Sequence, residues 1–443
     1  MTISISDHFT YKKLIRFVLP TICMMIITSV YSIVDGFFVS NIAGKNAFAA
    51  VNMIMPVNMA LGSMGFMFGS GGSALVAMTL GMGKKSKANQ YFSLIVYTIV
   101  VVGIVLSVLG ALLMPTLAEK LGATDLIIDD CITYGRTLMI SNTFFMLQNA
   151  FQTFLVVEEK PKMGLVISIC AGVMNIIFDI LLVYTLRMGV LGAALATAIS
   201  EITGGSILFI YFLRNKKGIL KLGRTKFYGR ALLKTCTNGS SEMVSNLSMS
   251  IVGMIYNIQL VKIASENGVA AYGVIMYLNF IFVSLFLGFS IGSSPIISYN
   301  FGADNKTELK QLLKKCLVIV ASTAFILVVI SQTFTSQLAA IFVGYDEELM
   351  EITVNGLSLY SISFAFCGFN IFSSAFFTAL NNGLISATIS FARTLVIQVI
   401  AVFTLPIFLG LNGIWLSIVA AEVVTLILSI TLFAANRKKY GYI

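Results

Sequence analysis

Charged side chains are scarce in this sequence. They make up 11% of its 443 residues, whereas 58% are hydrophobic and the mean hydropathy is +0.93. A water-soluble protein carries charge on about a quarter of its residues. The hydrophobic runs, such as 93–114 and 317–330, also lack the alternation of a lipid-facing barrel strand. Lipid is therefore the expected solvent for most of the surface, and the spanning segments are predicted to be α-helices.

Histidine and paired cysteine are almost missing. The single histidine is His8, in the polar N-terminal tail, which argues against histidine catalysis and histidine–zinc sites. The six cysteines show no CxxC spacing and lie mostly in hydrophobic runs, as small packing residues do. No nucleophile–base arrangement and no GxxxxGK[ST] phosphate loop occurs. The sequence therefore predicts neither an enzyme nor an ATP-driven pump, and no cofactor.

What is present is a series of apolar windows, each long enough to cross about 30 Å of hydrocarbon. Twelve spans are predicted, at 13–38, 48–79, 91–117, 132–156, 162–185, 190–213, 232–260, 268–299, 313–335, 353–379, 384–408 and 412–435.

Lysine and arginine indicate the orientation of these spans. With the N-terminus inside, the inner segments hold 23 of the 29 basic residues, the outer segments hold five, and Arg393 falls within a span. This bias predicts a multi-pass plasma-membrane protein with both termini in the cytoplasm. The net charge of +10 then reflects topology, and no nucleic-acid partner is expected.

The two halves of the chain are related. Shifting the sequence by 221 positions aligns 42–81 with 263–302 at 13 identities in 40, without a gap. The same shift carries Glu201 onto Glu422. Because each copy holds six spans, both insert in the same orientation, and parallel repeats of this kind place a substrate path between two bundles.

The domain organisation follows from this repeat. We expect an N-terminal six-helix lobe at 1–213, a basic cytoplasmic connector at 214–234 and a C-terminal six-helix lobe at 235–443. The lipid bilayer is the one extended partner that this layout requires.

Four polar residues lie at similar depth inside the N-terminal spans. Asp35 is late in the first span, Asn175 and Asp179 share one face of the fifth, and Thr197 is near the start of the sixth. Each lies roughly 8–12 Å from the outer boundary. Their oxygens suit Na⁺, and mutual repulsion of the two carboxylates would equally favour a proton. The alternative is that the two aspartates merely contact interfacial water near the helix ends.

Two further features leave alternatives open. Pro20 interrupts the first span and predicts either a static kink or a hinge coupled to Asp35. Glu201, Glu422 and Arg393 lie near the middle of their spans. Either Arg393 neutralises one glutamate in an interior ion pair, or a glutamate faces the central cavity and attracts a cationic substrate.

Taken together, these residues resemble the multidrug and toxic compound extrusion (MATE) family, in its DinF-like and MepA-like branch. The resemblance covers nearly the whole chain. It is carried by Pro20 and Asp35, by the segment from Asn175 to Asp179, and by the stretch 189–200 that contains Thr197. It implies a V-shaped pair of parallel six-helix bundles. It also implies that Na⁺ or H⁺ enters a site formed by these four polar residues as drug leaves.

The predicted function is antiport of small aromatic organic cations against Na⁺ or H⁺, by a monomer without an obligate protein partner. Coupling is expected in the N-terminal lobe alone, because the 221 shift places Tyr256 opposite Asp35. The alternative is a flippase for a lipid-linked precursor within the same broader superfamily. A flippase would need a wide cationic cavity, and Arg393 is the single clear buried cation.

Overall fold

The computed structural model describes residues 3–38, 42 and 44–442, and every regular element in this range is helical. The first half contains α1 (Tyr11–Phe38), α2 (Lys45–Gly81), α3 (Lys85–Lys120), α4 (Ile128–Val157), α5 (Pro161–Phe178), the π-helical η2 (Asp179–Thr185) and α6 (Gly189–Arg214). The second half contains α7 (Gly229–Gly302), α8 (Lys306–Thr333), α9 (Thr335–Val343), α10 (Glu347–Tyr360), η3 (Ser361–Ser363), α11 (Phe364–Ala379), α12 (Gly383–Phe391), the π-helical η4 (Ala392–Val396), α13 (Ile397–Leu409) and α14 (Leu411–Tyr440).

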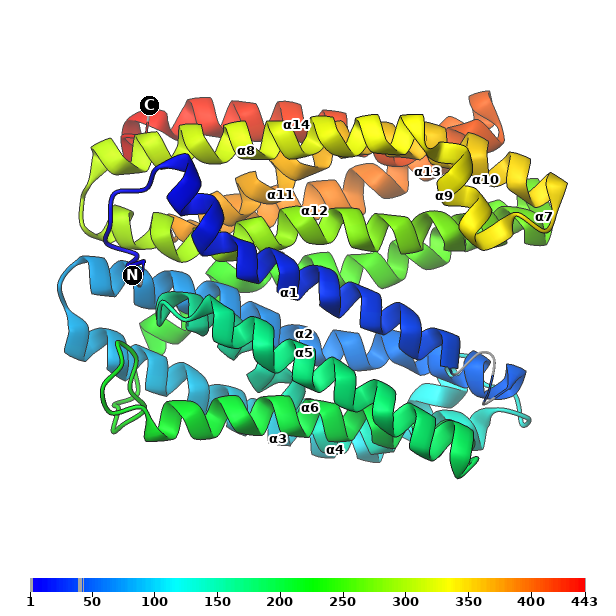
Figure 1. The fold of residues 1–443 in the computed structure, drawn as a ribbon, viewed down its shortest axis with the longest axis horizontal. Helices are drawn as coiled ribbons and strands as arrows, with labels where there is room; N and C mark the ends of the chain where they lie inside the picture. The colour runs from blue at the N-terminus through cyan, green and yellow to red at the C-terminus, as the bar shows by residue number, and fades with distance from the viewer. Residues whose placement is uncertain (1–2, 39–41, 43, 443) are drawn as a thin grey trace.

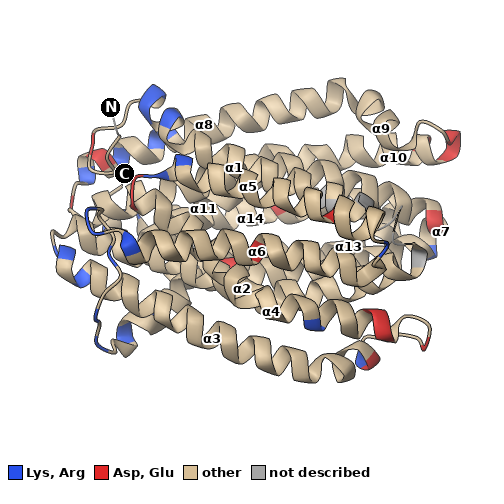
Figure 2. Cartoon of the chain, turned by 60° about the horizontal axis from the view of Figure 1, so that its bottom comes forward, with Lys and Arg blue, Asp and Glu red and all other residues tan. Residues whose placement is uncertain are grey.

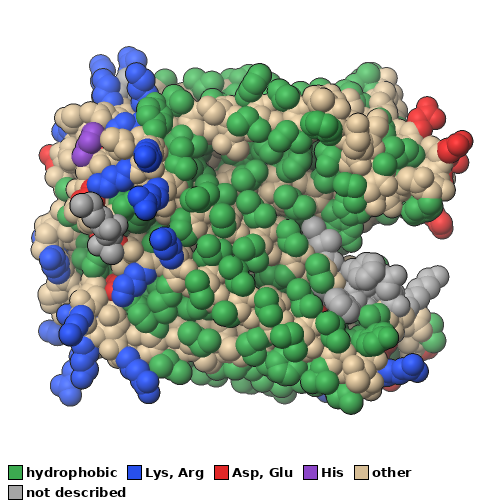
Figure 3. Space-filling view, in the orientation of Figure 1, with side chains coloured by type: hydrophobic (Ala, Val, Ile, Leu, Met, Phe, Trp, Pro, Cys, Tyr) green, Lys and Arg blue, Asp and Glu red, His purple; other side chains and the backbone are tan. Residues whose placement is uncertain are grey.

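The outer surface of this helical assembly is hydrophobic. Figure 3 shows apolar side chains covering the middle of the molecule, with charged side chains confined to its two ends. Leu112, Ile140 and Phe325 are 69%, 69% and 71% exposed. An apolar surface of this extent is stable only against lipid, which confirms the predicted all-α integral membrane class.

The expected number of spans is recovered with two adjustments. Among the described residues, ten helical segments are long and apolar enough to cross a bilayer. One of them, α7, holds two spans, because its backbone leaves helical geometry at Ala264 and Ser265. The more polar α4 supplies the twelfth. It packs against α2, α3 and α6, so its polar side chains are shielded from lipid by protein.

The two ends of the molecule carry opposite charge. Figure 2 shows Lys and Arg gathered at the end where both chain termini lie, and Asp and Glu concentrated at the other end. We call these the basic end, which carries Lys84, Lys160 and Lys310, and the acidic end, which carries Asp346 and Glu347. This segregation agrees with the charge bias read from the sequence.

The halves meet closely near the basic end and separate toward the acidic end, where Figure 3 shows a notch between them. The contact runs through α2 and α7. A Cβ on Gly81 would overlap the carbonyl oxygen of Tyr299, and a Cβ on Gly302 would overlap that of Met78. Gly81 and Gly302 are equivalent under the 221 shift, as are Met78 and Tyr299. The two halves therefore pack reciprocally, and glycine is required for the backbones to approach this closely.

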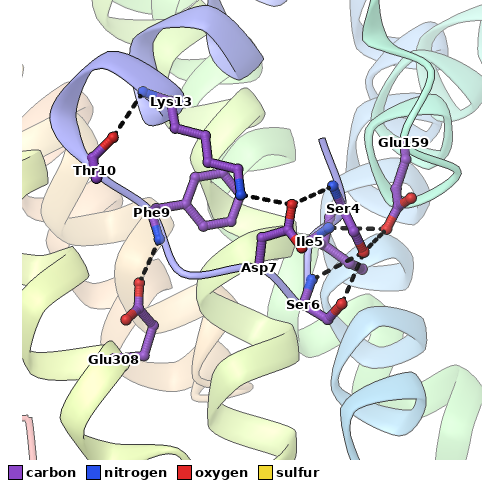
Figure 4. A network of polar contacts seen from close by, with 9 residues as sticks. All are labelled: Ser4, Ile5, Ser6, Asp7, Phe9, Thr10, Lys13, Glu159 and Glu308. Carbon is purple, nitrogen blue, oxygen red and sulfur yellow. Dashed lines mark hydrogen bonds and ion pairs between the residues drawn. The ribbon is translucent and has the colours of Figure 1, made fainter. Parts of the chain in front are cut away.

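The N-terminal segment links the two halves at the basic end (Figure 4). Glu159, between α4 and α5, accepts hydrogen bonds from the Ser4 hydroxyl at 2.5 Å and the Ile5 amide at 2.9 Å. Glu308, in the first turn of α8, accepts from the Phe9 amide at 3.0 Å. Ile5 and Phe9 are buried. A short strap of chain is thus hydrogen-bonded to both halves.

Candidate cation and substrate sites

The predicted polar cluster of the first half forms where α5 changes its helical geometry. Asn175 lies in the last turn of α5, and Asp179 opens the π-helical segment η2. Both side chains are buried, with Asp179 0% and Asn175 2% exposed. A π-helical turn is frequently associated with functional sites, because it re-aims side chains relative to a regular helix.

Thr197 of α6 contacts Asn175. The Asn175 amide nitrogen donates to the Thr197 hydroxyl at 3.5 Å. The helix that bears Asp35, α1, packs against α5 and also contacts η2. The Asp35 side chain itself lies outside the described part of the structure. The contact between the first and fifth spans that the shared site requires is therefore present, and the position of the fourth side chain stays a prediction.

This cluster suits a small cation. The Oδ1 atom of Asn175 is buried and has no hydrogen-bond partner among the described residues. A buried carbonyl oxygen without a partner is costly unless a ligand or water satisfies it. With the Asp179 carboxylate and the Thr197 hydroxyl close by, the donor set consists of hard oxygens, as Na⁺ prefers.

Pro20 and Glu201 are the other two residues of the first half that the sequence singled out. α1 continues through Pro20 to Phe38, so the structure contains no break there, and a hinge at Pro20 stays a prediction. The Glu201 carboxylate accepts a hydrogen bond of 2.5 Å from the Ser141 hydroxyl. This contact joins α6 to α4 within the first half.

The repeat equivalent of Glu201 has a different environment. Glu422 is 1% exposed and forms an ion pair with Arg393, whose Nε lies 2.8 Å from Oε1. The Asn370 amide donates to the other carboxylate oxygen at 2.7 Å and to the Glu422 carbonyl at 2.8 Å. The Asn370 oxygen in turn accepts from the Ser429 hydroxyl at 3.1 Å. Arg393 and Glu422 form the ion pair that was one of the two alternatives, and both also line a cavity. Attraction of a cationic substrate by a glutamate stays a prediction.

That cavity has a volume of about 370 Å³ and is walled mainly by the second half. α1 closes one side of it through Met25 and Ser29. Its wall also includes Glu242, in the first span of α7, which sequence reasoning missed. An available clue was a carboxylate about ten residues inside the predicted span 232–260.

The arrangement of the chain can be compared with known proteins. The MatE family model matches it twice, at residues 20–181 and 243–404, which together cover more than half of the chain. The chain belongs to the MatE (MATE) family. One match falls in each half, in agreement with the internal repeat. Glu242 and Glu422 lie outside both matched segments.

Its relatives within the MATE family include exporters. The multidrug export protein MepA of Staphylococcus saprophyticus is 24% identical over 421 residues, covering 94% of this chain and 91% of the relative. MepA of Staphylococcus haemolyticus is 24% identical over 440 residues, covering 97% and 94%. These likenesses span nearly the full length of each protein.

Solved MATE structures share the fold. A crystal structure of a MATE transporter in the straight conformation has a TM-score of 0.90 at 22% identity, covering 97% of this chain and 98% of that one. A transporter from Pyrococcus furiosus, described as having a binding pocket of reversed polarity that suggests a different function, has a TM-score of 0.91 at 22% identity, covering 98% and 97%. One fold therefore carries pockets of different polarity, and the substrate must be argued from the side chains.

Family membership confirms several sequence-based predictions. The chain is a multi-pass membrane transporter homologous to multidrug exporters, it is not an enzyme, and its fold is that of MATE transporters.

Proposed function

We propose that this chain is a secondary active exporter that exchanges small, aromatic organic cations for Na⁺ or H⁺. The observation that carries the proposal is the buried cluster of Asn175, Asp179 and Thr197, with an unsatisfied amide oxygen on Asn175, inside the membrane-spanning first half. Asp35 completes the cation site in this proposal. Burying the Asn175 amide oxygen without a hydrogen-bond partner is unfavourable unless it binds a ligand.

The position of α1 provides a route for coupling. α1 packs against α5 of its own half and against α7 of the other half. Its Met25 and Ser29 line the second-half cavity, while Asp35, further along the same helix, belongs to the proposed cation site. Cation entry would neutralise the repulsion between Asp35 and Asp179 and repack α1 about Pro20. The cavity wall would then move and release substrate, to the extent that the cation binds the two arrangements with different affinity.

The proposal also includes the orientation in the membrane, the domain boundaries and the oligomeric state. Both termini lie at the basic end (Figure 2), and the positive-inside bias supports a cytoplasmic location for this end in the plasma membrane. The lobes are taken as 1–213 and 235–443, with 214–234 as the connector. The transporter acts as a monomer without an obligate protein partner.

The test is ethidium efflux from a bacterium that lacks its own pumps. We expect wild-type chain to drive efflux that depends on a Na⁺ or H⁺ gradient, and the Asp179→Asn and Asp35→Asn variants to abolish that dependence at unchanged membrane levels. Asp129→Asn, which replaces an exposed carboxylate in the first turn of α4, is the matched control. Full gradient-coupled efflux by both aspartate variants would refute the proposed site.

The flippase alternative gains no support from the cavity. A lipid-linked pyrophosphate would need several free cations, whereas Arg393 is the one basic residue in the described cavity wall and already pairs with Glu422. Headgroup-dependent scrambling of lipid in reconstituted vesicles, without dye efflux, would reverse this preference.

A further inference from the structure

One side chain holds the N-terminal strap, residues 3–9, against the first half. The Ser4 hydroxyl and the Ile5 amide both donate to the Oε1 atom of Glu159, at 2.5 and 2.9 Å (Figure 4). Toward α2–α6 and their connectors, the described hydrogen bonds of the strap all end on this carboxylate. Hydrogen bonds to a carboxylate are stronger than those between neutral groups. Loss of Glu159 would therefore remove the polar attachment on this side.

The second-half side of the strap has several polar attachments. The Glu308 carboxylate accepts a hydrogen bond from the Phe9 amide at 3.0 Å, and its other oxygen lies 2.6 Å from the Nδ1 atom of His8. The Lys315 ammonium donates to the Phe9 carbonyl. Glu308 is buried, at 6% exposure. The strap is thus bound to α8 by more contacts than to the first half.

The start of α1, which follows the strap, also packs against the second half. A Cβ added to Gly288 of α7 would lie 2.6 Å from the Ile22 Cα, and one added to Gly292 would lie 3.0 Å from the Val18 Cβ. Segments packed this closely move as a unit. If the halves part at the basic end, the strap and the start of α1 therefore remain with α7 and α8. The contact with Glu159 is then the one that must break.

Glu159 has a backbone conformation that glutamate disfavours. Its φ of 63° lies in the left-handed region. In the connectors that follow α2, α7 and α11, this conformation is adopted by Gly83, Asp304 and Asn381, which are residue types that tolerate it. A glutamate at this position is unfavourable for the backbone alone, and such an outlier motivates a functional hypothesis. The hydrogen bonds of its side chain to the strap offset this cost.

Apolar side chains of the strap fill the boundary between the halves. Ile5 and Phe9 are 2% and 0% exposed. They belong to the same buried cluster as Val156 at the end of α4 and Leu309 of α8. Separation of the halves at this end would expose part of this cluster to water, which is unfavourable.

We propose that the strap is a latch that holds the basic end closed, and that its contact with Glu159 is the point of release. The halves meet at the basic end and are separated by the notch at the acidic end (Figure 3). Carrying a substrate across the membrane requires the reverse arrangement to form as well. The contact with Glu159 exists only while the basic end is closed, so it shifts the balance toward the closed arrangement. This inference depends neither on the coupling cation nor on the substrate class.

Two native cysteines report on the two ends of the molecule. Cys236, near the start of α7, is partly buried and packs against the apolar core of the first half. Parting of the halves at the basic end would uncover it. Cys131, near the start of α4 toward the acidic end, is fully buried. The alkylation rate of each cysteine by a water-soluble maleimide is measured by mass spectrometry, on the full-length protein in lipid nanodiscs.

Glu159→Gly tests the release point. It removes the carboxylate and supplies the residue that suits a left-handed backbone, so the chain should fold. When opening is rare, the alkylation rate follows the population of the open arrangement. We expect Cys236 to react about tenfold faster than in wild type, the effect of losing a charged hydrogen bond, and Cys131 to react at an unchanged rate.

Asp304→Gly is the matched control, because it makes the same backbone change at an exposed residue whose carboxylate faces Lys306. It should change neither rate. An unchanged Cys236 rate in Glu159→Gly would overturn the proposal. Faster alkylation of both cysteines would also overturn it, because that pattern indicates general destabilisation. An equal acceleration of Cys236 in Asp304→Gly would do the same, because the effect would then come from the glycine and not from the lost carboxylate.

A double-variant comparison tests whether Ser4 acts through Glu159. Ser4→Ala removes one of the two donors and should accelerate Cys236 alkylation by roughly threefold. In the Glu159→Gly background the same substitution should add little, because the hydroxyl has already lost its acceptor. Acceleration that multiplies in full would show that Ser4 holds the strap through other contacts, and would overturn Glu159 as the release point.

This experiment separates the latch from the proposed antiport, because alkylation requires no ion gradient. Gradient-dependent ethidium efflux combined with an unchanged Cys236 rate in Glu159→Gly would refute the latch alone. The expected alkylation pattern without gradient-dependent efflux would support the latch and refute antiport.

Discussion

The two halves of this transporter share a scaffold but not a polar site. Under the 221 shift, Asn175 and Asp179 of the first half correspond to Val396 and Ile400 of the second. In the other direction, Arg393 corresponds to Gly172, and Glu242 to Thr21. Each half thus lacks a charge where the other carries one.

In both halves, the polar site lies at a π-helical segment of the span. In the first half, the π-helical η2 begins at Asp179, and in the second half the π-helical η4 contains Arg393. These segments lie in repeat-equivalent spans but at different heights. The Gly81 and Gly302 contacts between the halves are thus the same in both repeats, whereas the polar residues beside the π-helical segments lie at different levels of the span.

The largest expected effect comes from removing the charge of the first-half cluster. Asp179→Asn keeps the shape of the side chain but removes the carboxylate that would bind the coupling cation, so gradient-dependent efflux should be lost. Asn175→Val installs the residue found at the equivalent second-half position and should weaken apparent cation affinity about ten- to hundredfold, the scale seen when a group supporting a metal site is lost. The measurement is the dependence of efflux rate on Na⁺ concentration and on pH. Unchanged dependence in Asn175→Val would place the cation elsewhere.

The next effect concerns stability of the second half. Glu422→Ala leaves Arg393 charged, buried and without its partner, which should lower the free energy of unfolding by about 3–5 kcal/mol. The repeat-equivalent Glu201→Ala removes the hydrogen bond from the Ser141 hydroxyl and should have a smaller effect. Both are measured by chemical denaturation in mixed micelles. The double variant Arg393→Leu/Glu422→Leu should recover most of the loss, and failure to recover it would show that the ion pair is not the cause.

A third prediction tests what the halves have in common. Gly81→Ala and Gly302→Ala each place a Cβ against a carbonyl oxygen of the other half. Overpacking of this kind lowers stability by about 1–3 kcal/mol. Because the contacts are reciprocal, the two variants should have equal effects on the unfolding midpoint. Gly223→Ala, where an added Cβ meets nothing within 4 Å, is the control. Unequal changes in the unfolding midpoint would mean that the two symmetric contacts contribute differently to stability.

Sequence reasoning recovered the scaffold more completely than the sites. Long apolar runs must be helical in lipid, so the spans followed directly, including the division of α7 near Ala264. The short α9 was not predicted, because the apolar window 313–335 ended before it. The four-residue spacing of Asn175 and Asp179 predicted that they share one helix face. The rise per residue predicted that Thr197 lies at the same depth in the membrane, and these two regularities of a helix can be read from sequence.

The second-half site could not be obtained in the same way. Whether Arg393 reaches Glu422 depends on which faces of η4 and α14 meet, and the sequence carries no direct record of that contact. The hydrogen bonds from Asn370 to Glu422 likewise depend on how α11 packs against α14, which the sequence does not show. Glu242 could have been selected from the sequence, because a carboxylate inside a membrane span usually has a functional or pairing role. That it lines the same cavity as Arg393 could be learned only from the structure.

The smallest expected effects compare the hydrogen bonds of the two equivalent glutamates. Ser141→Ala removes one donor to Glu201 and should lower the free energy of unfolding by about 1 kcal/mol. Asn370→Ala removes two donors to Glu422 and leaves Ser429 without its acceptor, so its effect should be about two to three times larger. Combining Asn370→Ala with Glu422→Leu and Arg393→Leu should remove most of that excess, because the carboxylate that needed the amide is gone. Asn370→Ala could instead lower the free energy of unfolding by the same amount in that background. The Asn370 amide would then stabilise the second half mainly through its hydrogen bond to the Glu422 backbone carbonyl, and not through the carboxylate.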